Sequence, residues 1–262
     1  MALTGLVGGV LAGLLGVGGG IVIVPVLEVV LSILGVDPEI RMHVAVATSQ
    51  STIILTSISS TRAHLKRHSV DVDLVKRWGL AMFIGAVVGV IVAGHVHGRV
   101  LSAVFAVVAL LVAVKMMLPL DNRTLTKEVP HGAGAQVVPG VIGTLSSMMG
   151  IGGGTLSVPI MTLLNQPIHR AVGTAALFGL VISAPATIGF IIAGFNNSAL
   201  PNGSLGFVNV IGFAVIAPAT MLSAPWGARL AHGLQKRQLS LLFGVFLFIV
   251  AVRMFYRATQ GD

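Results

Sequence analysis

The sequence predicts an all-α polytopic membrane protein built from two inverted repeats, each a glycine-broken re-entrant helical hairpin plus three transmembrane helices. The first observation is the composition. Of 262 residues, 55% are hydrophobic and 9% are charged, with a mean hydropathy of +0.98, whereas soluble domains carry about 25% charged residues. The second observation is a glycine motif that occurs twice. The third is an uneven distribution of positive charge between the loops.

Long uncharged runs indicate helical membrane spans. Residues 1–27, 132–168 and 171–228 contain no Asp, Glu, Lys or Arg, and each helix needs about 20 apolar residues to cross a bilayer. The chain has no cysteine, which excludes a disulfide framework, an iron–sulfur cluster and a thiolate metal site. We expect no cofactor and no metal. The net charge of +8 is attributed to membrane orientation, so no nucleic acid partner is expected.

The glycine motif identifies an internal repeat. Gly16–Gly20 reads GVGGG and Gly150–Gly154 reads GIGGG, and each string is followed by a proline, Pro25 or Pro159. Further along, the segment AVAT ending at Thr48 matches AVGT in the second half. Self-similarity of this kind indicates two copies of one structural unit.

Each copy is expected to contain one broken stretch followed by three helices. In the first repeat, residues 1–118, these elements are predicted at 4–34, 44–61, 78–96 and 99–117. Residues 119–133 are predicted to be a cytoplasmic linker. In the second repeat, residues 134–262, the elements are predicted at 135–165, 171–194, 206–229 and 237–255. An unbroken helix over 4–34 would be about 46 Å long, so each broken stretch is expected to divide at its glycines.

The positive charges favour an inverted arrangement over eight full spans. If both broken stretches are re-entrant and the 62–77 loop is inside, twelve of the sixteen Lys and Arg residues lie inside. Only Arg41, Arg99, Arg253 and Arg257 then lie outside. If the broken stretches span fully, the split is weaker, at ten to six. Basic residues gather on the cytoplasmic side of membrane proteins, which supports inversion, although full spans remain the alternative.

The glycine strings predict an anion site at the middle of the membrane. A helix break in lipid is tolerated only where protein or a cavity covers it, and glycine permits the positive φ angles that a break needs. A helix that restarts there directs unpaired N–H groups and a partial positive charge at the break. We therefore predict that two such N-termini converge on an anion, with backbone ligands from Gly18, Gly19, Gly20, Gly152, Gly153 and Gly154.

Other glycines have a simpler explanation. Gly85, Gly89 and Gly94 lie inside predicted helices, where small residues let helices pack closely. On this interpretation Gly85→Ala should have almost no effect.

The duplicated motif, each copy followed some 20 residues later by an AV(A/G)T helix start, resembles the TauE/SafE family of sulfite exporters. The resemblance covers essentially the whole chain. It implies transport of a sulfur-containing anion, such as sulfite, sulfoacetate or another organosulfonate, across the bacterial inner membrane. Substrates vary within the family, and nothing in the sequence selects one.

Polar residues beside the predicted helix breaks are further candidates for substrate binding. Thr48, Ser49 and Gln50 begin a hydroxyl-rich helix, and Thr174 is the counterpart of Thr48 in the second repeat. We predict all four as anion ligands. The alternative is that such hydroxyls bond to the backbone of their own helix.

Five ionisable residues are predicted to gate the path or couple it to protons. They lie near helix ends or inside a hydrophobic stretch, and ionisable groups within a membrane are functional candidates. Interfacial anchoring is the alternative explanation for the basic ones. The residues are His43, His169, Arg41, Arg170 and Glu28.

Three functions compete at this point. A secondary transporter, which exports its anion in exchange for or together with protons, is the first. A passive anion channel on the same scaffold is the second. An intramembrane enzyme is not expected, because no span carries a Ser–His pair or paired carboxylates at usable spacing. The expected partners are a small anionic substrate and the lipid bilayer, with a homodimer as one expected assembly.

Overall fold

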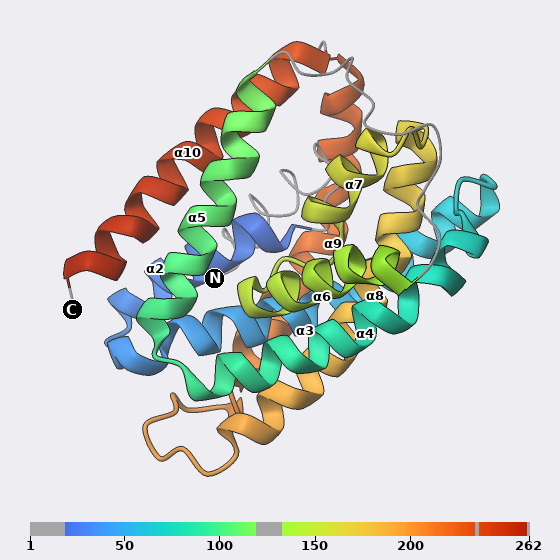
Figure 1. The fold of residues 1–262 in the computed structure, drawn as a ribbon. Coiled ribbons are helices and arrows are strands. Elements are labelled where there is room, and N and C mark those ends of the chain that lie inside the picture. The colour runs from blue at the N-terminus through green and yellow to red at the C-terminus, as the bar shows by residue number, and fades with distance from the viewer. Residues whose placement is uncertain (1–18, 119–132, 234–235, 261–262) are drawn as a thin grey trace.

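The computed structural model describes residues 19–118, 133–233 and 236–260 (Figure 1). The helices of the first half are α2 (Gly20–Ile33), α3 (Pro38–Lys66), α4 (Val72–His95) and α5 (Gly98–Met117). Residues 4–18 of the first broken stretch, Gly18 among them, lie outside the described residues, as does the predicted linker up to residue 132.

The second half begins with a short 3-10 helix, η1 (Ala133–Gln136). The long elements that follow are α6 (Val137–Met149), α7 (Gly154–Leu163), α8 (Ile168–Gly194), α9 (Val210–Gly233) and α10 (Lys236–Gln260). Two short strands, β1 (Ser204–Leu205) and β2 (Val208–Asn209), pair antiparallel between α8 and α9.

Three of the described helices are long and apolar enough to cross a membrane. They are α4, α5 and the segment His169–Gly194 of α8. The helices α2 and α7, which adjoin the glycine strings, are apolar but short, at 14 and 10 residues. The described chain thus fits a polytopic membrane protein of helical type.

Helix boundaries differ from the predictions where capping residues decide them. The helix predicted at 44–61 begins at Pro38, because the side chain of Asp37 accepts a hydrogen bond from the N–H of Glu39. The helix predicted at 78–96 begins at Val72, because Asp71 caps the N–H of Leu74. The helix predicted at 206–229 begins only at Val210, since the preceding residues form the strand pair.

Helices from the two halves pack against each other throughout. Figure 1 shows α5 and α10 side by side along one edge of the molecule, and α3 lies against α8 and α9. The helices α3 and α8 run antiparallel. Ser69, after the end of α3, lies against Gly173 near the start of α8, and residues before α3 share a surface cleft with residues 199–202, which follow α8.

The interface between α4 and α6 corrects the expectation for Gly85. A Cβ atom on Gly85 would collide with the carbonyl oxygen of Gly140 on α6, and one on Gly89 would collide with the carbonyl oxygen of Thr144. Because these obstacles are backbone atoms, they cannot rotate away. An added methyl group at Gly85 is therefore not neutral, although the sequence-based expectation was that it would be.

Candidate functional site

The second glycine string separates two half-helices, α6 and α7. The first half-helix, α6, ends at Met149, after which Gly150 and Gly152 adopt φ angles of 68° and 59°. Such positive values favour glycine. The second half-helix, α7, starts at Gly154, and its N-cap is Gly153, which has no side chain to cap the helix. The broken stretch predicted at 135–165 therefore divides at its glycines.

The N-terminus of α7 presents free backbone donors. The N–H of Ser157 donates to the carbonyl of Gly153, which is the first bond of the helix. The N–H groups of the residues before Ser157 consequently have no acceptor within the helix. They are accompanied by the buried hydroxyls of Thr155 and Ser157, which have no hydrogen-bond partner among the described residues.

The end of the first glycine string, at Gly20, lies against the second string. Gly19, with φ 76°, is the N-cap of α2, and Gly20 begins that helix. A Cβ atom on Gly20 would lie 2.7 Å from the Cα of Ile151 and against the carbonyl oxygen of Gly150. Only glycine at position 20 permits this approach, and it brings the N-terminus of α2 to the second break.

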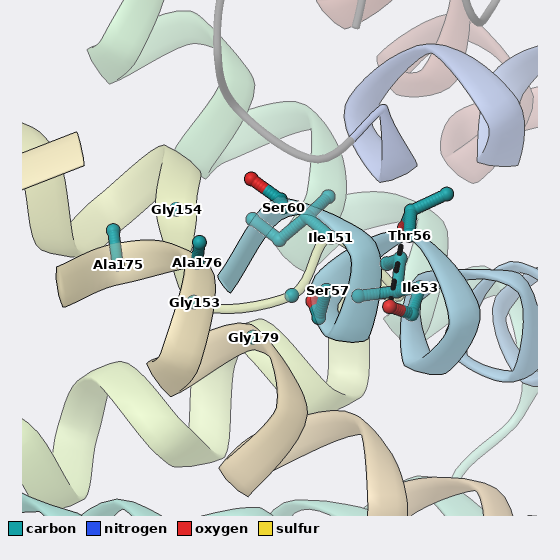
Figure 2. Close-up of a pocket in the computed structure, with 11 residues that line it drawn as sticks. Ile53, Thr56, Ser57, Ser60, Ile151, Gly153, Gly154, Ala175, Ala176 and Gly179 are labelled. Carbon is teal, nitrogen blue, oxygen red and sulfur yellow. Dashed lines mark hydrogen bonds between the residues drawn. The ribbon is translucent and has the colours of Figure 1, made fainter. Parts of the chain in front are cut away.

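A small pocket opens where the second break faces α3 and α8 (Figure 2). Its volume is about 30 Å³, which exceeds the roughly 10–15 Å³ that one water molecule needs. Figure 2 shows the α3 residues on one side and the break and α8 on the other. The described residues of its lining are Ile53, Thr56, Ser57, Ser60, Ile151, Gly152, Gly153, Gly154, Ala175, Ala176 and Gly179.

The pocket offers hydrogen-bond donors without a charged side chain among its described lining residues. The backbone of Gly152–Gly154 comes from the positive end of the α7 dipole. Ser57 is buried at 5% exposure, and its hydroxyl makes no hydrogen bond with the described residues. A helix N-terminus with nearby hydroxyls is a suitable site for a small anion.

Ser49 and Gln50 reach the break from outside the pocket. The hydroxyl of Ser49 donates to the carbonyl of Gly150 at 2.7 Å. The amide of Gln50 donates to the carbonyls of Ser146 and Ser147 at 3.1 and 3.3 Å, and its oxygen accepts from the hydroxyl of Ser183 at 2.7 Å. These bonds add side-chain donors to the carbonyls of Ser146 and Ser147, which also accept the N–H groups of Ile151 and Gly150 at the end of α6.

Thr48 and Thr174 hold the starts of two other helices. The hydroxyl of Thr48 accepts from the N–H of Asn209, and that of Thr174 accepts from the N–H of Asp71. Neither threonine lines the pocket, although both are fully buried.

Arg41, which is partly buried, and Glu28, which is buried, form an ion pair away from the pocket. Their closest charged atoms are 3.9 Å apart, and their side chains are 11% and 4% exposed. The guanidinium of Arg41 also donates to the carbonyl of Val36 at 2.7 and 3.1 Å. The structure thus joins two residues that the sequence singled out separately.

The two histidines differ in their surroundings. His43 is buried, its Nε2 lies 3.0 and 3.1 Å from the carbonyl oxygens of Ala93 and Val96, and its ring stacks on Phe207. His169 is exposed, and the neighbouring Arg170 lies 3.6 Å from the carboxylate of Asp71. None of these three predicted gating residues lines the pocket.

Sequence reasoning missed the pocket residues of α3 and α8. Ile53, Ser57 and Ser60 recur at helical spacing, which places them on one face of α3. The sequence shows that these residues share one face of α3. It does not show that this face lies against the second break, which the structure reveals. Gly179 looked like any other glycine within a helix.

Comparisons with known proteins agree with one another. Residues 1–254 match the family described as sulfite exporter TauE/SafE. A probable membrane transporter protein of Haemophilus influenzae is 30% identical over 97% of both chains. The probable membrane transporter protein YunE of Bacillus subtilis is 26% identical over 98% of this chain and 96% of its own length. No solved structure matches. The chain therefore belongs to the sulfite exporter TauE/SafE family of membrane transporters.

Proposed function

We propose that this membrane transporter exports a small sulfur-containing anion across the bacterial inner membrane, coupled to protons. Sulfite, sulfoacetate and other organosulfonates are the substrate candidates. The observation that carries the proposal is the N-terminus of α7, where Gly152–Gly154 and the hydroxyl of Ser57 surround a pocket whose described lining carries no charged side chain. The description of the family as sulfite exporters supports the choice of anion.

The pocket binds the anion through neutral donors. Backbone N–H groups and hydroxyls replace the water that a sulfur oxyanion loses on entering the protein, and the partial positive charge of α7 offsets its charge. The N-terminus of α2, which Gly20 brings against the second break, adds a second positive helix end near the site. A cradle without a full positive charge also lets the anion leave, which transport requires.

Ser49, Gln50, Thr48 and Thr174 support this site and are not ligands of the anion in our proposal. Ser49 and Gln50 fix the carbonyl end of α6, so the break keeps its shape when the anion enters and leaves. Thr48 and Thr174 attach α3 and α8 to neighbouring helices.

Glu28 is our candidate for proton coupling. Its carboxylate is buried beside Arg41 on the half-helix that starts at Gly20. A buried carboxylate next to an arginine can be neutralised by a proton when the pair separates. Movement of α2 against α3 would therefore change the affinity of Glu28 for a proton. The same movement would shift Gly20 against the second break and change the shape of that break.

Reconstitution into proteoliposomes tests the proposal. Flux of sulfite, sulfate, thiosulfate and sulfoacetate is measured with and without an imposed pH gradient. We expect saturable flux of at least one sulfur anion and uphill movement when the gradient is imposed. Non-saturating flux that ignores the pH gradient would favour the passive channel, and a lack of flux for all four anions would overturn the assignment of substrate.

A further inference from the structure

The side chain of Ile53 lies between Gly20 at the start of α2 and Gly152 in the second break. It is 1% exposed. Its Cδ1 lies 2.8 Å from the position that a Cβ of Gly20 would take, and its Cγ2 lies 3.0 Å from that of Gly152. Ile53 therefore packs against Gly20 through Cδ1 and against Gly152 through Cγ2 and Cδ1.

The counterpart of Ile53 in the second half is a glycine. The alignment that pairs Thr48 with Thr174 pairs Ile53 with Gly179. Gly179 lines the pocket, and a Cβ atom there would lie 2.5 Å from the hydroxyl oxygen of Ser57. At this pair of equivalent positions, α3 carries the side chain of Ile53 and α8 carries only the hydrogen of Gly179. The pocket therefore lies on the side of Gly179.

Exposure along α3 changes at Ile53. Toward the C-terminal end of the helix, Ser57 is 5% exposed, and Thr56 and Ser60 are half-buried. Toward the N-terminal end, the polar residues 48–50 are fully buried and bonded to neighbouring elements. The pocket consequently opens toward the 62–77 end of the protein and is closed in the other direction.

We propose that Ile53 is the barrier between the anion pocket and the opposite side of the protein, and that Thr56, Ser57 and Ser60 line the passage from the pocket to the 62–77 end. This rests on the proposed function in taking the pocket as the anion site. A buried aliphatic side chain stops a hydrated anion because it cannot replace the lost water. Passage requires Ile53 to move away from Gly20 and Gly152.

Cysteine accessibility tests the barrier directly, because the chain has no native cysteine. Ser57→Cys and Ser60→Cys are exposed to a membrane-impermeant maleimide from each side of oriented membranes. Arg67→Cys and Ser198→Cys, both at exposed positions at opposite ends of the molecule, mark the two sides. We expect the cysteines at 57 and 60 to react much faster from the Arg67 side than from the Ser198 side.

The second arm removes the barrier. Adding Ile53→Ala to Ser57→Cys should raise labelling from the Ser198 side at least tenfold, whereas Ile54→Ala, at a half-buried position outside the pocket lining, should not. If Ile53→Ala fails to fold, Ile53→Val supplies a smaller increase in the same direction. Equal labelling rates of Ser57→Cys from the two sides with Ile53 intact would overturn the proposal, as would unchanged sidedness in the folded Ile53 variants.

Protection by ligand separates this inference from the proposed function. Sulfoacetate, which does not consume maleimide, is added during labelling of Ser57→Cys. Protection with unchanged sidedness in Ile53→Ala would retain the anion site and overturn the barrier. Loss of sidedness in Ile53→Ala without protection by sulfoacetate, sulfate or thiosulfate would retain the barrier and overturn the anion site.

Discussion

The hydroxyl of Thr48 accepts the backbone N–H of Asn209 at 3.0 Å, and Asn209 in turn caps α9 by accepting the N–H of Gly212 at 2.7 Å. The same arrangement occurs once more. Thr174 accepts the N–H of Asp71 at 2.9 Å, and Asp71 caps α4. In each half, a threonine that aligns with its counterpart anchors the start of a helix from the other half. These threonines therefore link the halves.

Replacing either threonine should destabilise the fold. Thr48→Val and Thr174→Val keep the volume but remove an acceptor. The buried N–H of Asn209 then lacks its partner, which costs about 1–3 kcal/mol, and the part-buried N–H of Asp71 should cost less. We expect a lower apparent Tm in detergent, with unchanged anion affinity in the folded fraction. Thr48→Ser and Thr174→Ser keep the hydroxyl and serve as controls. An unchanged Tm with weakened affinity would return both threonines to the set of ligands that the sequence predicted.

Gly153→Ala should abolish or severely weaken anion binding. The added methyl would lie 2.9 Å from the Cβ of Phe178 and 3.1 Å from its carbonyl carbon. The break must therefore shift, and its N–H groups no longer point into the pocket. We expect at least tenfold weaker binding, or about 1.4 kcal/mol, by isothermal titration of monodisperse protein. Gly79→Ala is the matched control, since its nearest neighbour would be 3.9 Å away. Equal affinity in both variants would place the anion elsewhere.

Gly85→Ala should lower stability, in contrast to Gly79→Ala on the same helix. The methyl at position 85 meets the carbonyl oxygen of Gly140, whereas the methyl at 79 meets only the side chain of Val75. Overpacking of this kind costs about 1–3 kcal/mol. Thermal unfolding followed by size-exclusion chromatography measures the difference. Identical unfolding curves would mean that α4 and α6 move apart to accommodate the methyl group without a loss of folding free energy.

Glu28→Gln should remove the effect of a pH gradient on transport while leaving anion exchange intact. The amide has the size of the carboxyl group but carries no titratable proton. Counterflow of labelled anion without a gradient should therefore persist, and gradient-driven accumulation should disappear. Glu39→Gln, at an exposed position at the start of α3, is the control. Gradient-driven accumulation that survives in Glu28→Gln would exclude this residue from coupling.

The inverted arrangement predicts opposite sidedness for two loops. Arg67→Cys and Ser198→Cys should label from opposite sides of the membrane, with Arg67 on the cytoplasmic side where the basic residues gather. The antiparallel course of α3 and α8 supports this expectation, because the alignment pairs these two helices. Labelling of both cysteines from the same side would favour eight full spans.

The sequence by itself determined the membrane class, the family and the position of the second break. The membrane class follows from composition and from the long apolar runs that helical spans in lipid require. Neither depends on which residues come together in the folded protein. The break at Gly150–Gly154 was equally readable, because a run of glycines disfavours a helix wherever it occurs.

Only the tertiary structure decided what the polar residues and the other glycines contact. Ser49 and Gln50 bond to carbonyls about a hundred positions away in the chain, whereas Ser57, a similar residue on the same helix, faces the pocket. Gly79 and Gly85 are alike in sequence and differ in what lies opposite them. Side-chain type follows from the sequence, but the partner of a side chain depends on how helices from the two halves pack. That packing brings the hydroxyl of Ser49 to the carbonyl of Gly150 and places Ser57 in the lining of the pocket.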